Sequence, residues 1–163
     1  MPATREDLFS RLAALNIETK TKDHAPVYTV EEARALRGEI SGSHCKNLFL
    51  KDKKGVLWLV VTLEDASVDL KTLPKRIGSA RLSFGKAELL LEVLGIEPGS
   101  VTPFALINDT DIQVQVVLDE TMMANEVLNY HPLKNDATTS ISSQDLLKFI
   151  QSCGHAAQIA QVG

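Results

Sequence analysis

The side chains best suited to chemistry lie in residues 43–50, which read SHCKNLFL. Polar and reactive side chains there precede an apolar run. A charged turn that ends in glycine and a second apolar run follow, which predicts a β-hairpin over 46–51 and 56–62. Lys46 would then begin a strand, where its ammonium can act as a compact cation beside a phosphate or a developing negative charge. The ordinary alternative is an exposed lysine at a strand start without such a role.

His44 and Cys45 raise the question of a nucleophile or a metal site. Adjacent residues of a strand point to opposite faces of the sheet, so these two side chains cannot readily form a Cys–His dyad. The other histidines show no ligand spacing with Cys153. We therefore expect no metal site and a buried, structural Cys45. A Cys-based hydrolase is an open alternative, in which Cys45 would be indispensable.

A loop after a predicted helix supplies the second candidate, made of Gly99, Ser100, Val101, Thr102 and Pro103. Its glycine permits close approach of the backbone and its proline stiffens the loop. Backbone N–H and C=O groups can then point at a small substrate. A plain loop at the exit of a helix gives the same pattern.

His131, followed by Pro132, is the third candidate. A neutral imidazole can bond an amine or shape a pocket. Thr138 and its neighbours Thr139 and Ser140 could line the same cleft, although a strand of threonines needs no such role. A turn histidine held by the following proline is the alternative for His131.

The elements that must position these residues follow from the spacing of apolar residues and from capping residues. We expect helices over 4–16, 29–37, 69–77, 86–94 and from Ser142 to Gly154. We expect strands over 17–23, 81–84, 104–107, 112–118 and 137–141, besides the hairpin. Residues 125–132 are ambiguous, and His155 with the tail after it is expected to be a frayed end. Irregular alternation of strands and helices, with short turns between several strands, favours a mixed α+β sheet.

Composition and length favour one ordinary soluble domain over residues 1–163, large enough to bury a core. No apolar run approaches the ~18 residues of a membrane span. Residues 1–15 carry acids and lack the apolar segment of a signal peptide. The two cysteines form no CxxC pattern, which favours a reducing, cytoplasmic location.

The charge is distributed unevenly, although the net charge of −4 argues at first against a nucleic-acid partner. Residues 51–86 contain eight basic and four acidic side chains. Residues 87–126 contain eight acidic side chains and no Lys or Arg. One part could face phosphate while the other repels it, and ordinary scatter over solvated faces is the alternative.

Three segments together resemble the YbaK-like editing family: HCKNLFLKDKKG at 44–55, GSVTP at 99–103 and YHPLKNDATTSISSQDLLKFIQSCGH at 130–155. These domains are related to the editing insertion of bacterial prolyl-tRNA synthetase. The resemblance is closest to the freestanding deacylases that clear alanine mischarged on proline tRNA. It implies the fold of those editing domains, which is α+β, a single compact domain with a mixed, mostly antiparallel sheet flanked by helices.

The resemblance also implies roles for individual residues. Lys46 falls on the essential lysine of the family, residues 99–103 on its G-x-x-x-P loop and His131 on its pocket histidine. Asn47 and Thr138 lie in the same signature and complete the candidate substrate-binding set. The 2′-hydroxyl of the terminal ribose is implied to assist, and no metal or organic cofactor is required.

The expected function is therefore a hydrolase that acts in trans on alanyl-tRNA(Pro). A proline pocket cannot strongly exclude the smaller alanine, because each missing methylene costs only ~1–3 kcal/mol, and a second, smaller site completes a double sieve. An aminoacyl ester is already reactive, so a positioned water and an oxyanion site could suffice. The expected partners are proline tRNA charged with alanine and possible docking on prolyl-tRNA synthetase, with no DNA and no membrane. There are two alternatives. The substrate could be cysteinyl-tRNA(Pro), or the chain could be a non-catalytic module that binds tRNA or the synthetase.

Overall fold

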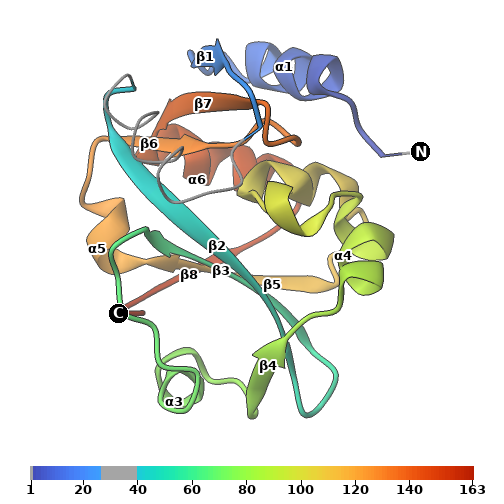
Figure 1. The fold of residues 1–163 in the computed structure, drawn as a ribbon, viewed down its shortest axis with the longest axis vertical. Helices are drawn as coiled ribbons and strands as arrows, with labels where there is room; N and C mark the ends of the chain where they lie inside the picture. The colour runs from blue at the N-terminus through green and yellow to red at the C-terminus, as the bar shows by residue number, and fades with distance from the viewer. Residues whose placement is uncertain (1, 27–39) are drawn as a thin grey trace.

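The computed structural model describes residues 2–26 and 40–163 (Figure 1). Its strands are β1 (Lys20–Asp23), β2 (Ser43–Asp52), β3 (Leu57–Leu63), β4 (Leu82–Phe84), β5 (Val114–Asp119), β6 (Val127–Tyr130), β7 (Ala137–Ser142) and β8 (Ala157–Ala160). Its α-helices are α1 (Arg5–Ala14), α3 (Leu73–Ile77), α4 (Ala87–Leu94), α5 (Glu120–Met123) and α6 (Ser143–Ser152). Two 3-10 helices follow α4, namely η1 (Pro98–Ser100) and η2 (Pro103–Asn108).

One mixed sheet connects the whole molecule, in the strand order β1-β7-β6-β2-β3-β5-β8, with β4 on β2. The pairings β1–β7, β6–β7, β2–β3 and β2–β4 are antiparallel. The pairings β2–β6, β3–β5 and β5–β8 are parallel. Antiparallel pairings therefore predominate in the described part of the chain, and the expected α+β fold is confirmed. Strand β2 joins the two halves of the sheet and runs diagonally across Figure 1.

The β2–β3 hairpin forms where the sequence predicts it. Asp52 closes its turn, because the buried carboxylate accepts hydrogen bonds from Lys54 N at 2.9 Å, Val56 N at 3.0 Å and Trp58 Nε1 at 3.1 Å. Burial alone would raise the pKa of Asp52, but these hydrogen bonds outweigh it and lower the pKa below its ordinary value. Gly55 supplies the positive φ of 86° that the turn requires.

The two faces of β2 pack on different cores. Phe49 packs on the larger core with Leu59 and Phe104, and helices α1, α4 and α6 contribute to the same cluster. Leu50 packs on the smaller core with Trp58, where α3 and the C-terminal segment contribute. This division follows from the alternation of side chains along a strand. The segment 43–47 at the start of β2 is only half-buried.

Two predictions about elements are wrong, and one lies outside the described residues. Residues 104–107 belong to the 3-10 helix η2, which Pro103 starts and the Thr102 hydroxyl caps by accepting from Phe104 N at 3.3 Å. The tail is ordered rather than frayed: β8 pairs with β5, and His155 is only 3% exposed. The helix expected at 29–37 falls within the part of the chain that is not described.

No helix in the described residues combines the length and the apolar character that crossing a membrane requires.

Candidate functional site

Lys46 lies in β2 opposite Thr62 of β3 and is half-buried. Its ammonium donates to the carbonyl oxygen of Ala66, in the turn that follows β3. The buried Thr62 hydroxyl donates to Asp119 at 2.6 Å, and this bond joins β3, the strand beside Lys46, to the end of β5. A lysine held in this way keeps its charge at a defined place.

The parallel register of β2 and β6 relates Lys46 to His131. Ser43 and Leu128 are paired, as are the next residues of both strands, and the side chains of Cys45 and Tyr130 then contact each other. Lys46 and His131 each follow that contact by one residue. Because Cys45 packs on the larger core, the alternation of side chains along β2 turns Lys46 to the opposite side, and His131 comes directly after the end of β6. No hydrogen bond joins the two side chains directly within residues 2–26 and 40–163.

His131 is the best-defined polar group of the site. Its Nδ1 lies 2.9 Å from the carbonyl oxygen of Ala137. A carbonyl oxygen only accepts, so Nδ1 carries the proton in the neutral ring and Nε2 keeps a lone pair. Burial is the main cause that lowers the pKa of His131 below its usual value. Its imidazole is therefore neutral at physiological pH, with an acceptor available at Nε2.

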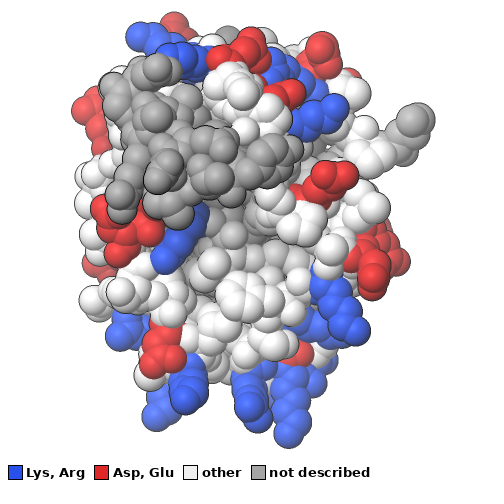
Figure 2. Space-filling view, viewed as in Figure 1, with Lys and Arg blue, Asp and Glu red and all other residues white. Residues whose placement is uncertain are grey.

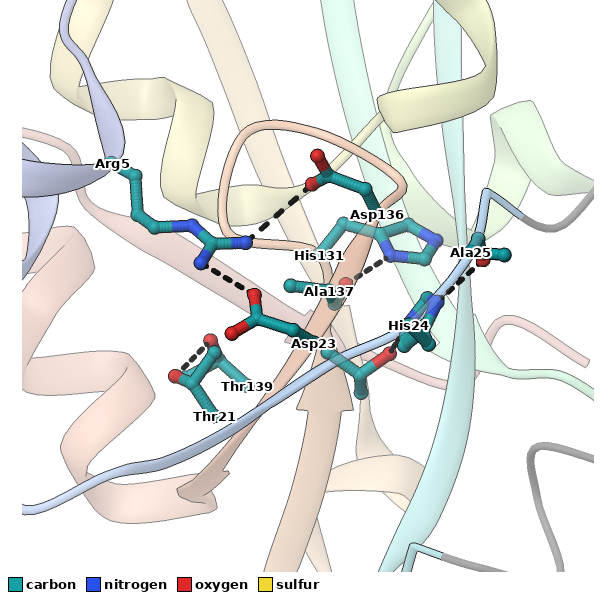
Figure 3. A network of polar contacts seen from close by, with 10 residues as sticks. Arg5, Thr21, Asp23, His24, Ala25, His131, Asp136, Ala137 and Thr139 are labelled. Atoms are coloured by element: carbon teal, nitrogen blue, oxygen red, sulfur yellow. Dashed lines mark hydrogen bonds and ion pairs between the residues drawn. The ribbon is translucent and has the colours of Figure 1, made fainter.

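His24 is a site residue that the sequence analysis missed. Its Nε2 lies 2.9 Å from the hydroxyl of Thr138, and its ring meets that of His131 edge to face with centroids 6.4 Å apart (Figure 3). The bond joins residues 114 positions apart, so local spacing gave no signal for it. The structure thus brings together His24, His131 and Thr138 from three different segments.

The predicted loop at 99–103 lies beside the His131 loop, because a Cβ on Gly99 would come 3.5 Å from the side chain of Asn135. That is an ordinary contact, so the packing of the protein itself does not demand glycine there. Ser100 and Thr102 are buried, and the Thr102 hydroxyl is used as a helix cap. The loop therefore offers mainly backbone groups, of which the Thr102 N–H has no acceptor among the described residues.

Asn47 does not share a face with Lys46. It points to the side of Cys45 and Phe49, and its Oδ1 is buried without a hydrogen-bond partner in the described part of the chain. A buried acceptor left without a partner costs stability. The structure therefore gives Asn47 a place beside the core side of the sheet rather than beside the lysine.

Cys45 is unsuited to nucleophilic attack. Burial raises the pKa of its thiol to about 11, so it stays protonated near neutral pH. His44 cannot activate it, because His44 Nε2 lies 3.4 Å from the carbonyl oxygen of Ile40 instead. Among residues 2–26 and 40–163, no three His, Cys, Asp or Glu side chains are arranged to hold a metal ion.

Basic side chains gather at the end of the molecule formed by the β2–β3 hairpin, α3 and β4 (Figure 2). A groove of about 860 Å³ there is lined by Phe84, which is 65% exposed, and by side chains of both charges: Lys51, Lys53, Arg81 and Lys86 with Asp52, Glu88 and Glu92. The eight basic residues between 51 and 86 are all exposed. The basic stretch of the sequence thus forms a continuous end of the fold.

Comparisons with known proteins identify the family and the fold of the chain. A sequence profile of the aminoacyl-tRNA editing domain matches residues 24–149. Prolyl-tRNA synthetase associated domain-containing protein 1 of Bos taurus is 41% identical over 156 residues, which are 93% of this chain and 91% of that one. The prolyl-tRNA editing protein ProX of Acetoanaerobium sticklandii is 37% identical over 152 residues, 93% of each chain. The crystal structure of a protein proposed as a trans-editing enzyme for prolyl tRNA synthetase shares the fold, with a TM-score of 0.72 at 19% identity over the whole of both chains.

Proposed function

Because this chain belongs to the aminoacyl-tRNA editing domain family, we propose that it hydrolyses the ester of alanine mischarged on proline tRNA, acting in trans. The observation that carries the proposal is the state of His131. Its Nδ1–H donates to the Ala137 carbonyl, its pKa is lowered mainly by burial, and its Nε2 is an acceptor. Such a group can receive hydrogen bonds from the amine or the water of an ester-hydrolysis site.

Lys46 supplies the positive charge in this proposal. Its ammonium, held at the Ala66 carbonyl, would anchor the terminal nucleotide or steady the charge that develops on the ester oxygen. The backbone of residues 99–103 would position substrate and water, with the Thr102 N–H as one donor. The 2′-hydroxyl of the terminal ribose would assist the attack of water, as the family resemblance implies.

The basic end of the fold supports a tRNA partner. Exposed lysines and arginines line the groove beside β4, and phosphate contacts supply most of the sequence-independent affinity for nucleic acids. The acidic stretch 87–126 would keep the rest of the surface away from the backbone of the tRNA. We further propose prolyl-tRNA synthetase as a docking partner and the cytoplasm as the location.

The test compares proline tRNA charged with alanine, cysteine or proline, and follows loss of each ester with time. Rapid loss of the alanyl ester alone supports the proposal, and preferential loss of the cysteinyl ester moves the substrate to cysteine. The Lys46→Ala variant should lose the activity. Lys148→Ala is the matched control, because Lys148 also donates to a backbone carbonyl, that of Leu15, away from the site.

If a folded protein that binds tRNA hydrolyses none of the esters, hydrolytic activity is excluded and the alternative of a non-catalytic binding module remains. The Cys45→Ala variant separates a further alternative. A Cys-based hydrolase would lose its activity, whereas our proposal expects hydrolysis within about twofold of the unsubstituted protein, since the Cys45 thiol is protonated.

A further inference from the structure

The two histidines of the site have defined protons. His24 Nδ1 lies 2.8 Å from the Ala25 carbonyl oxygen, just as His131 Nδ1 lies 2.9 Å from that of Ala137. Carbonyl oxygens only accept, so in the neutral form both rings are protonated at Nδ1 and bare at Nε2. The tautomer of each ring is therefore set by the backbone.

Thr138 takes its orientation from His24. With a bare Nε2 on His24, the 2.9 Å contact requires the Thr138 hydroxyl to donate. The Thr138 oxygen then presents only lone pairs to any third group. Thr138 is 6% exposed, so its hydroxyl has few other ways to turn.

The free polar atoms of His131 and Thr138 are thus acceptors and not donors. His131 offers a lone pair at Nε2, where no described residue bonds it, and Thr138 offers one at its hydroxyl oxygen. The charges nearby are mixed: Lys22 pairs with Thr138 across the two strands, and Arg5 binds Asp23 at 2.6 Å and Asp136 at 3.5 Å (Figure 3). Two acceptors that have no donor of their own are complementary to a cation that only donates.

We propose that His131 and Thr138 form a subsite for the protonated α-amino group of the aminoacyl ester, and that His24 is the positioning residue that makes Thr138 an acceptor there. The inference rests on the proposed function and specifies which end of the substrate this site recognises. His24 acts through Thr138 and does not touch the ester.

Arg5 holds the two segments that carry the subsite. Asp23 precedes His24, and Asp136 precedes Ala137, so one guanidinium spans both. The His24 N–H also donates to the Asp136 carbonyl at 2.9 Å. Helix α1 therefore contributes to substrate recognition from outside the site, through its first residue.

The experiment compares two esters on the same tRNA, alanyl and lactyl, where a hydroxyl replaces the α-amino group. Each enzymatic kcat/KM is divided by the uncatalysed rate, because the two esters differ in intrinsic reactivity. The unsubstituted protein should prefer the alanyl ester by roughly tenfold or more, as expected when a charged hydrogen-bonded group is replaced. His24→Phe, which keeps a ring but has no acceptor, should lower this ratio several-fold, because only His131 then remains as an oriented acceptor.

Further variants separate a positioning role of His24 from a general loss of structure at the site. His24→Gln retains an acceptor and should recover part of the preference. Thr138→Val should lose the same preference as His24→Phe, and the double variant should lose no more, because the two residues act as a unit. Thr21→Val is the control: it breaks the 2.8 Å hydroxyl contact with Thr139 in the same strand pair and should leave the ratio unchanged.

An equal loss of both esters in His24→Phe, or an unchanged ratio, would overturn the subsite while leaving the proposed function intact. Failure of the proposed function shows separately, as absence of hydrolysis by the unsubstituted protein. In that case calorimetry with 3′-alanylamido- and 3′-lactylamido-adenosine, which are not hydrolysed, decides the subsite. Preference for the alanyl compound that His24→Phe reduces supports it, and equal binding of both compounds by the unsubstituted protein overturns it.

Discussion

His131 and His155 show how one side chain serves two purposes in one fold. His155 is buried and its Nε2 lies 2.9 Å from the equally buried carboxylate of Asp109. His131 is half-buried, stands beside a second imidazole and, among the described residues, bonds only a backbone carbonyl. The His155 pair joins the start of β5 to the segment before β8. The Nε2 of His131, which follows the end of β6, has no partner in the described part of the chain.

The comparison teaches that two features decide whether a histidine is structural or part of a site. One is the partner of its first ring nitrogen, and the other is whether its second ring nitrogen is exposed. Asp109 also accepts from Gln113 N at 3.0 Å and Val114 N at 2.8 Å, so it organises a turn as well as His155. The interactions of that pair are internal, and the second nitrogen of His155, Nδ1, is buried without a hydrogen-bond partner among the described residues. The unused acceptor of the His131 cluster belongs instead to a ring that is only half-buried.

The largest effect is expected at Asp109. Asp109→Ala removes the acceptor of three donors, two of them buried, and should lower the free energy of unfolding by ~3–5 kcal/mol, measured by urea denaturation. Hydrolysis per folded molecule should not change. Asp109→Asn, which keeps one acceptor, should lose clearly less. A loss below ~1 kcal/mol would show that the pair is not the structural element we describe.

The opposite result is expected at His131. His131→Ala should lower kcat/KM for the alanyl ester by roughly a hundredfold, because it removes the acceptor of the site. Its free energy of unfolding should change by only ~1 kcal/mol. His155→Ala serves as the matched variant, with stability lowered and kcat/KM retained. If His155→Ala loses hydrolysis as strongly while folded, the distinction between the two histidines is wrong.

The pH profile sharpens the same contrast. The pKa of His131 is lowered mainly by burial, so the folded state binds fewer protons than the unfolded state just below the ordinary value of about 6.5. The contribution of His131 to stability is complete above that pH and is lost as the pH falls through the folded pKa. kcat/KM should fall over the same range, as Nε2 gains a proton. His131→Asn should remove this fall of kcat/KM at low pH. If the fall persists in that variant, it belongs to another group.

The smallest effect is expected at Arg5, whose carboxylate partners are half to three-quarters exposed. Arg5→Gln should change the free energy of unfolding by only ~0.5 kcal/mol, as exposed ion pairs do. It should nevertheless reduce the alanyl preference several-fold, because both segments of the subsite lose their common anchor. Glu6→Gln, an exposed neighbour on the same helix, should change neither quantity.

Local patterns predicted the elements that carry local signals. Thr4 and Asp7 form the capping box that starts α1, and Gly95 ends α4 with a φ of 66°. The hairpin of β2 and β3 follows from two apolar runs around a charged turn. Lys46 and His131 were singled out by their residue types and their resemblance to the editing family. In each case the signal lies within a few neighbouring residues.

The sequence by itself thus determined the α+β class, the hairpin that carries Lys46, and the family whose fold this chain adopts. Only the tertiary structure decided that His24 meets Thr138 and that His155 is buried against Asp109. The physical reason is that these bonds join residues 114 and 46 positions apart, and depend on strand order and register. Burial, which lowers the pKa of His131, is likewise a property of the assembled sheet and not of any local stretch.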